Sequence, residues 1–114
     1  MSVNEHRTPQ EEVDFQILNS PDDKDPGNRT FIFGNEDHTL GNALRHVLMQ
    51  RRETQFCGYS IPHPSEPKMN LRLQTVNKDT DAVDLLKTGL KDLSEICDVV
   101  DETFDDALAK FKAK

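Results

Sequence analysis

Two neighbouring residues, Asp37 and His38, are of the types that perform general acid–base chemistry. A carboxylate can orient an imidazole, and the imidazole can then move a proton to or from a substrate. No serine or cysteine that could act as a nucleophile lies close to them in the sequence. The same two residues are equally typical of a turn that enters a helix. A small enzyme using Asp37 and His38 is therefore the less favoured interpretation and stays open as an alternative.

The residues that commonly bind metals do not form a recognisable pattern. Cys57 and His63 are metal-ligand types, but they stand alone and at the wrong spacing for a zinc site. The second cysteine, Cys97, is far from the first, and there is no Cys-x-x-Cys pair. We expect both to be free, buried thiols in a reducing compartment. With no glycine-rich phosphate loop either, the sequence predicts no cofactor and no metal.

The stretch from residue 36 to 48 indicates a turn followed by an amphipathic helix, expected over about 39–51 with Thr39 as its N-cap. Gly41 and Asn42 are poor helix formers, and a glycine inside a helix costs about 1 kcal/mol relative to alanine. We therefore expect another backbone or side chain to approach the helix closely there. Arg45 follows one turn later, on the side of Gly41. The apolar positions form one separate stripe: Leu40, Leu44, Val47 and Leu48.

Four segments have the pattern of β-strands: about 13–18, 30–33, 55–61 and 68–76. The first two should pair as an antiparallel hairpin across the turn-rich segment 19–28. The segment 62–67 contains three prolines and is expected to be a stiff loop. The last strand alternates most clearly, because Met69, Leu71 and Leu73 alternate with polar residues. This alternation predicts a sheet with one buried face.

A long helix is expected from about residue 82 to Phe111. Its apolar residues alternate steps of three and four, as in a heptad stripe over four repeats: Val83, Leu86, Leu90, Leu93, Cys97, Val100, Phe104, Ala107 and Phe111. About 31 residues at 1.5 Å each give a helix of roughly 46 Å. Strands of five to eight residues span roughly 17–27 Å, so the end of the helix should project and need a partner. The alternative is a helix that lies on its own sheet and frays at its end.

The composition limits the class of protein. Only 34% of the 114 residues are hydrophobic, which allows one domain with a modest core. With the order of elements, this predicts an α+β fold, a small antiparallel four-stranded sheet packed with two helices in the order β-β-α-β-β-α. Residues 1–12 are expected to form a flexible acidic tail and residues 13–114 the domain. There is no long apolar run, so we expect no membrane segment.

The net charge of −7 is unevenly distributed. Residues 1–28 carry −5, residues 29–80 carry +2, and residues 81–114 carry −4. No segment has the dense run of lysine and arginine that nucleic-acid binding requires. We therefore expect no direct sequence-specific binding to nucleic acid, and any work on DNA or RNA should proceed through other chains.

Several motifs resemble one family of proteins. The run Thr39-Leu40-Gly41-Asn42-Ala43-Leu44-Arg45 is similar to the signature of the alpha-like subunits of multisubunit RNA polymerases. Residues 56–66 and 70–75 resemble a narrower group, the small (L-type) alpha-like subunit shared by eukaryotic RNA polymerases I and III. The resemblance covers roughly residues 30–112. The equivalent subunit of RNA polymerase II or of an archaeal polymerase shares the first motif and the Pro-His-Pro, and it remains the alternative.

The resemblance implies a non-catalytic subunit that forms a heterodimer with the larger D-type alpha-like subunit. That dimer would be the platform on which the second-largest and then the largest polymerase subunits assemble, in the nucleus, including the nucleolus. The long helix would serve dimerisation. The residues expected in the core or at the dimer interface are Leu40, Leu44, Val47, Leu48, Leu90, Leu93, Cys97, Val100 and Phe104. The residues expected to contact the large subunits are Gly41, Asn42 and Arg45.

Overall fold

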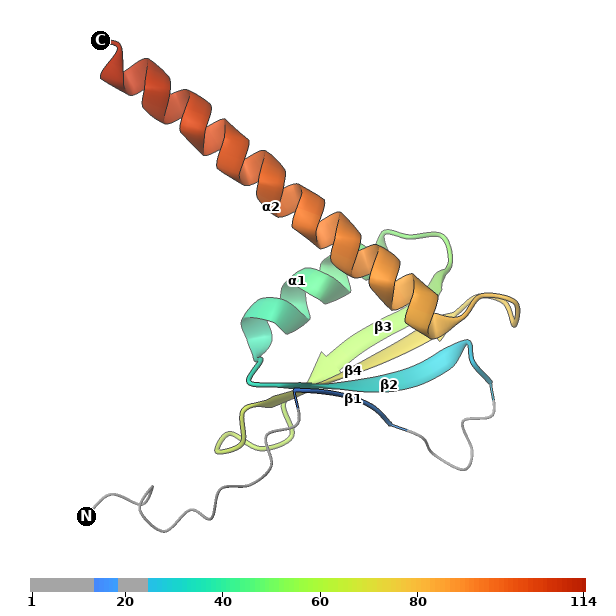
Figure 1. Ribbon diagram of the computed structural model, residues 1–114. Coiled ribbons are helices and arrows are strands. Elements are labelled where there is room, and N and C mark those ends of the chain that lie inside the picture. Colours follow the sequence, from blue (N-terminus) through green and yellow to red (C-terminus); the bar gives the residue numbers. More distant parts are fainter. Residues whose placement is uncertain (1–13, 19–24) are drawn as a thin grey trace, which may run out of the picture.

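A computed structural model describes residues 14–18 and 25–114 of the chain, so the expected tail at 1–12 lies outside the described residues. The described residues form four strands and two helices in the predicted order (Figure 1). Their bounds are β1 Phe15–Leu18, β2 Asn28–Gly34, α1 His38–Met49, β3 Thr54–Ser60, β4 Lys68–Thr75 and α2 Ala82–Lys112. The α+β prediction is confirmed. No helix in this part of the chain is long and apolar enough to span a bilayer.

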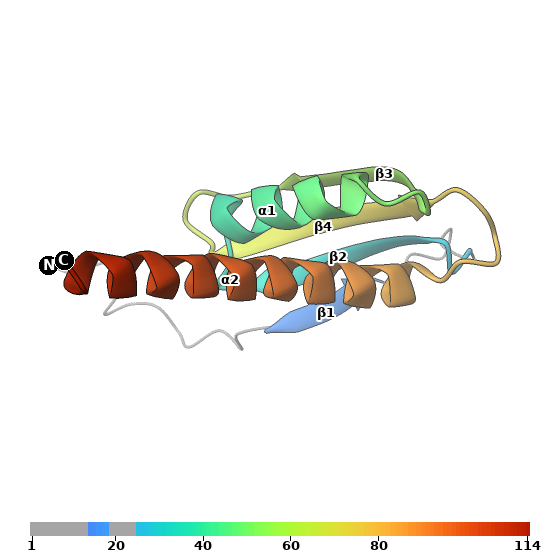
Figure 2. The same ribbon diagram turned by 90° about the horizontal axis from the view of Figure 1, so that it is seen from above.

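The four strands form one antiparallel sheet in the order β1-β2-β4-β3. The expected hairpin of β1 with β2 is present, with Phe15 opposite Phe33. Strand β4 lies between β2 and β3, and its buried and half-buried residues alternate along its whole length. Both helices lie over the same face of the sheet (Figures 1 and 2). This is the arrangement that the alternation of β4 predicts, one face buried and the other more polar.

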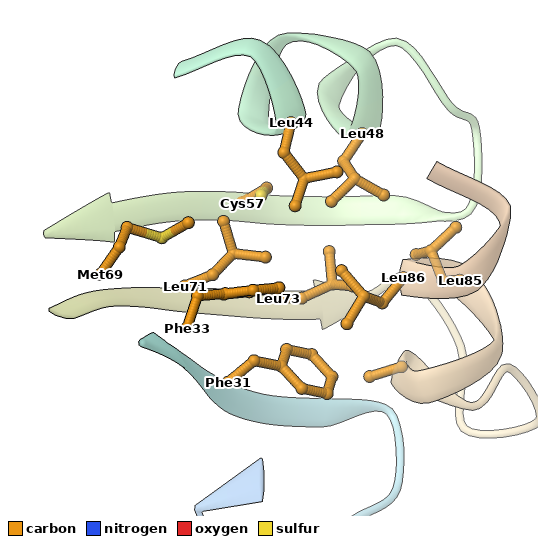
Figure 3. Close-up of a cluster of buried hydrophobic side chains, with 11 residues drawn as sticks. Phe31, Phe33, Leu44, Leu48, Cys57, Met69, Leu71, Leu73, Leu85 and Leu86 are labelled. Atoms are coloured by element: carbon orange, nitrogen blue, oxygen red, sulfur yellow. The ribbon is translucent and has the colours of Figure 1, made fainter. Parts of the chain in front are cut away.

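The hydrophobic core lies between this face and the two helices (Figure 3). Leu44 and Leu48 extend from α1 toward the central strands, while Leu85 and Leu86 reach them from the first turns of α2. Side chains of the sheet complete the core: Phe31, Phe33, Cys57, Met69, Leu71 and Leu73. Only the first part of α2 contributes to this core, since its buried residues end at Gly89.

The start of α2 is fixed by hydrogen bonds to the ends of the strands. The Asp81 carboxylate accepts a hydrogen bond from the Val83 N–H at 2.9 Å, as an N-cap does. The Ala82 N–H donates to the carbonyl of Pro26, just before β2, at 2.8 Å. These bonds tie the first turn of α2 to the end of the β1–β2 connection. The direction of the helix is therefore set close to its first residue.

Two details differ from the sequence prediction. The N-cap of α1 is Asp37 and not Thr39, because the Asp37 side chain accepts a hydrogen bond from the Thr39 N–H at 3.0 Å and the helix begins at His38. Both residue types cap helices well, and the aspartate comes first along the chain. The expectation of two buried thiols is half wrong, since Cys57 is buried and Cys97 is exposed. Cys97 lies on the part of α2 that no described residue covers.

The full burial of Leu44 gives a first prediction. Leu44→Ala should lower the free energy of unfolding by about 2–5 kcal/mol, because it removes buried atoms and leaves a cavity under α1. Urea denaturation of the purified variant measures this change. Met49→Ala on the same helix is the control, since Met49 is 44% exposed and its loss should cost under about 1 kcal/mol. Equal costs for the two variants would contradict the described position of α1.

Candidate subunit interface

The second half of α2 carries an uncovered apolar surface. The helix extends beyond the sheet and rises away from it toward its C-terminus (Figures 1 and 2). Val100 is 60% exposed, Phe104 63% and Phe111 74%. We call the exposed apolar side chains on this side of the helix the distal ridge: Ile96, Val100, Phe104, Leu108 and Phe111. A ridge of this size on one chain is typical of a surface that binds another protein.

The distal ridge continues the stripe that packs the first half of α2 onto the core. At 100° per residue, Leu86, Leu93, Val100 and Phe104 lie within a narrow sector of the helix. Leu86 is buried, Leu93 is half-buried, and the later two are exposed. These four residues lie on one side of the helix, so their exposure rises with distance from the start of the helix and does not depend on which side they are on. A partner that covers the ridge must therefore contact the same side of α2 that, near the start of the helix, packs onto this chain's own core.

The nine residues expected in the core or at the dimer interface fall into two groups, one on α1 and one on α2. Leu44, Val47 and Leu48 are buried in the chain's own core, and Leu40 packs against that core. The five on α2 stand largely outside it: Leu90, Leu93, Cys97, Val100 and Phe104. Their presence at a dimer interface stays a prediction, but all five are available for one.

A groove lies beside the ridge, where the end of α1 meets α2. It has a volume of about 630 Å³, and Val47 lies among its lining residues. An ion pair stands within the same lining, because Arg51 Nε and Nη2 donate to the two carboxylate oxygens of Asp92 at 2.7 and 2.9 Å. Val99, which is off the main stripe of α2, lines the groove together with Ile96. The groove thus places the apolar side chains of Ile96 and Val99 beside the charged residues that make up much of its lining.

The Arg51–Asp92 pair fastens α1 to α2 through both oxygens of one carboxylate. The hydrogen bond from Arg51 holds the pKa of Asp92 below its ordinary value, and Asp92 raises the pKa of Arg51. Because the Asp92 pKa is depressed, the pair stabilises the fold above the pKa of an unfolded aspartate, about 4. That contribution is lost as pH falls through the depressed value. Each side chain is about one third exposed, so the contribution is modest.

Tyr59 of β3 explains the glycine at the start of α1. A methyl group at Gly41 would lie 2.6 Å from Cδ2 of the Tyr59 ring, closer than packed carbon atoms allow. The ring is also fixed at its far end, because a 3.0 Å hydrogen bond joins its hydroxyl to His38 Nδ1. The close approach predicted at Gly41 is confirmed, and the side chain that makes it comes from the same chain.

The three residues expected to contact the large subunits differ in exposure. Gly41 is buried beneath Tyr59, whereas Asn42 and Arg45 are exposed on α1. Only the latter two therefore present side chains to another protein. The position of Gly41 supports a different role for the motif. The glycine lets α1 pack closely on β3, and its exposed neighbours Asn42 and Arg45 are left to contact another protein. Contact of these residues with a large subunit remains a prediction.

The residues considered for catalysis are engaged in the fold. The Asp37 carboxylate caps α1 and His38 bonds to Tyr59, so the two do not form an acid–base pair with each other. Burial raises the pKa of the Cys57 thiol to about 11, although the charge of Arg45 acts in the opposite direction. That thiol is therefore protonated at neutral pH and poorly suited to attack a substrate. Among the described residues, no group of His, Cys, Asp and Glu is arranged to hold a metal.

Two further contacts of this site were not identified from the sequence. Gly89 lies where α2 crosses α1, and a methyl group there would clash with a terminal carbon of Leu48. A glycine in the middle of a strongly periodic helix is the signal that could have revealed this crossing. The pairing of Arg51 with Asp92 gave no such signal, because the two residues are 41 positions apart.

The contact of Gly41 with Tyr59 gives a second prediction. Gly41→Ala should lower the free energy of unfolding by about 1–3 kcal/mol, because the new methyl group must displace the Tyr59 ring. In a Tyr59→Ala background the same change should be neutral or stabilising by up to about 1 kcal/mol, since alanine favours helix. Urea denaturation of the four proteins forms a double-mutant cycle. An identical cost in both backgrounds would show that Tyr59 is not what excludes a side chain at position 41.

Comparison with known proteins identifies the family. Residues 28–103, more than half of the chain, match the family described as the RNA polymerase Rpb3/Rpb11 dimerisation domain. The crystal structure of DNA-directed RNA polymerase subunit L from Thermoplasma acidophilum has a TM-score of 0.69 to this chain and covers 88% of it, with 93% of its own length matched. The two sequences are 15% identical, so this likeness shows the fold alone.

Curated relatives narrow the assignment. The "DNA-directed RNA polymerases I and III subunit RPAC2" of Schizosaccharomyces pombe is 57% identical over 81 residues, which are 71% of this chain and 64% of the relative. The chain therefore spans less than two thirds of that protein. The Drosophila melanogaster protein of the same name is 49% identical, over 76% of this chain and 81% of the relative. The chain belongs to the Rpb3/Rpb11 dimerisation-domain family, within the group of small alpha-like subunits shared by RNA polymerases I and III.

Proposed function

We propose that this chain is a non-catalytic subunit of RNA polymerases I and III that forms a heterodimer with the larger D-type alpha-like subunit. The observation that carries the proposal is the distal ridge, an apolar surface that no described residue of the chain covers. The heterodimer is the platform on which the second-largest and then the largest subunits assemble, for transcription of ribosomal and small RNA genes. The protein works in the nucleus, including the nucleolus.

The energetics favour a partner on α2. A large apolar side chain that passes from water into a packed interface contributes about 1.5–3 kcal/mol. The distal ridge offers several such side chains on one side of one helix, with Cys97 and Leu90 beside them. Covering them offsets the entropic cost of association. A partner that presents helices of its own fits best, because successive ridge residues are three or four positions apart, the spacing at which the side chains of two helices interlock.

A second face, on α1, suits the larger subunits. The segment from His38 to Arg52 contains three arginines and no carboxylate. Asn42 and Arg45 are exposed there, away from the stripe that packs into the core. An arginine can donate two parallel hydrogen bonds to a carboxylate or bond to backbone carbonyls. The large subunit is therefore expected to offer acidic or carbonyl groups to this face.

The ridge gives a third prediction. Replacing Val100 with Glu and Phe104 with Lys should lower the affinity for the recombinant D-type subunit by about 100-fold or more, since both side chains are expected at the centre of the interface. The circular dichroism of the isolated chain should change little, because both residues lie outside its core. Isothermal titration with the partner measures the affinity.

The control for this variant lies on the opposite side of the same helix. Asp98 and Glu102 are each about 160° from Val100 around the axis, and both are exposed. The double change Asp98→Ala with Glu102→Ala should leave the affinity within about threefold, since exposed charges away from an interface contribute little. If the ridge variant binds as tightly as the original chain, the end of α2 is not at the interface and the proposed dimer geometry is wrong.

Arg45 gives a fourth prediction. Arg45→Ala should leave the heterodimer intact but weaken its capture of the second-largest subunit by about tenfold, the effect of losing one charged contact at an interface. A pull-down of that subunit on immobilised heterodimer, at several subunit concentrations, measures the loss. Arg52→Ala removes the same charge from an exposed arginine just beyond α1 and should have a smaller effect. If Arg45→Ala unfolds the chain instead, Arg45 is a structural residue.

A further inference from the structure

Strand β3 forms one edge of the sheet. The Thr54 N–H at its start donates to the Arg51 carbonyl at 3.2 Å, but from Cys57 onward its outer side has no backbone partner in the described part of the chain. The strand has seven residues, and none of them is charged or a proline. Natural sheets usually protect such an edge with a lysine, a proline or a covering segment. One irregularity is present, between Thr54 and Phe56, and the rest of the strand is regular. An unprotected edge of this length is suited to pairing with another strand.

The register shows which backbone groups of β3 face outward. In an antiparallel sheet, successive residues of a strand direct their N–H and C=O groups to opposite neighbours. The Thr75 N–H of β4 donates to the backbone just before β2, so the groups of Arg72, three residues earlier, face β3. Gly58 lies opposite Arg72 and faces β4 in turn. The backbone groups of Cys57 and Tyr59 therefore point away from the sheet.

Helix α1 projects side chains over this free edge. Gly41 rests on the Tyr59 ring, and Arg45, one turn later, is close enough for its charge to act on Cys57. The helix thus runs along β3. Leu44 and Leu48 turn inward to the core, so the side of α1 that carries Asn42 and Arg45 must lie above the outer border of β3. Arg45 has no carboxylate partner among the described residues.

The other face of the edge carries one large apolar side chain, Phe56, beside polar residues of β4. Phe56 is 47% exposed and lies on the face of the sheet opposite the helices, because it alternates with the buried Cys57. Its ring extends across Gly58, where an added methyl group would lie 2.8 Å from the ring's Cζ. A strand placed beside β3 would therefore have Arg45 and Asn42 above it and the Phe56 ring below it. The arginine favours a carboxylate on the upper side, and the ring favours an apolar side chain on the lower side.

We propose that the free edge of β3 receives an extended segment of the second-largest polymerase subunit as a fifth strand. In this segment, acidic and apolar side chains alternate, the acidic ones under Arg45 and the apolar ones against Phe56. The backbone of Cys57 and Tyr59 supplies the hydrogen bonds and the two flanking side chains supply the selectivity. This inference rests on the proposed function, since it names how the large subunit binds the face that includes Asn42 and Arg45.

Amide hydrogen exchange at single-residue resolution tests the proposal directly. The sample is the full chain in its heterodimer with the D-type subunit, before and after addition of the purified second-largest subunit. Before addition, the amides of Cys57 and Tyr59 should exchange quickly and that of Gly58 slowly. After addition, exchange at Cys57 and Tyr59 should slow by about 100-fold or more, because each amide gains a hydrogen bond. Fast exchange at both in a formed complex overturns the fifth strand.

A pair of variants gives a second measurement. Phe56→Ser should weaken capture of the second-largest subunit by about tenfold, since it removes the apolar ring beneath the added strand. Leu18→Ser is the matched control, because Leu18 is 42% exposed and lies on the same face at the opposite edge of the sheet. It should leave capture unchanged. Equal effects of the two variants overturn the assignment of the segment to the β3 edge.

These results distinguish a failure of the proposed function from a failure of the added strand at β3. If the heterodimer does not capture the second-largest subunit at all, the proposed function fails and the β3 inference fails with it. If capture occurs and Arg45→Ala weakens it, but the amides of Cys57 and Tyr59 stay unprotected, only the added strand is wrong. If the amides become protected and Phe56→Ser weakens capture, the edge of β3 is the binding site.

Discussion

Helix α2 crosses α1 so closely at Gly89 that a methyl group there would clash with the side chain of Leu48 unless that side chain moved. This contact, the Arg51–Asp92 pair and the bonds at the start of α2 fix the helix at three positions within its first eleven residues. Because the helix is held near its start and is 31 residues long in all, its later turns extend beyond the sheet. The exposure of the distal ridge is therefore a consequence of how the first third of the helix is packed.

The two helices provide separate contact surfaces. The stripe of α2 serves this chain's core in its first half and is open to a partner in its second half. On α1, one side packs into the core and the other lies above the edge of β3, with Tyr59 fixing the distance between helix and strand. The proposed dimer and the proposed large-subunit contact thus use separate surfaces on opposite sides of the same small core. Both surfaces depend on a glycine that lets two elements approach closely.

The sequence predicts what depends on local spacing and fails where distant residues meet. The alternation along β4 and the heptad stripe of α2 follow from neighbours in the chain, so both elements were predicted to within one residue. The glycine at 41 predicts a close approach, but not that Tyr59 makes it. The N-cap was misplaced by two residues because both residue types cap helices, and aspartate, the more favoured of the two, stands two positions earlier. The position of β4 between β2 and β3, and hence the free edge of β3, depends on tertiary packing that no local pattern contains.

The boundary between core and ridge links folding to assembly. Leu90 is 37% exposed and Leu93 is half-buried, so both stand between the buried start of α2 and the exposed distal ridge. A partner that covers the ridge would also cover the exposed parts of these two leucines. Binding of this kind stabilises the folded state of the subunit, because the partner binds the folded chain and not the unfolded one. A fold with a modest core gains most from such a contribution. In the proposed dimer, the length of α2 would help to keep this small domain folded as well as join it to the partner.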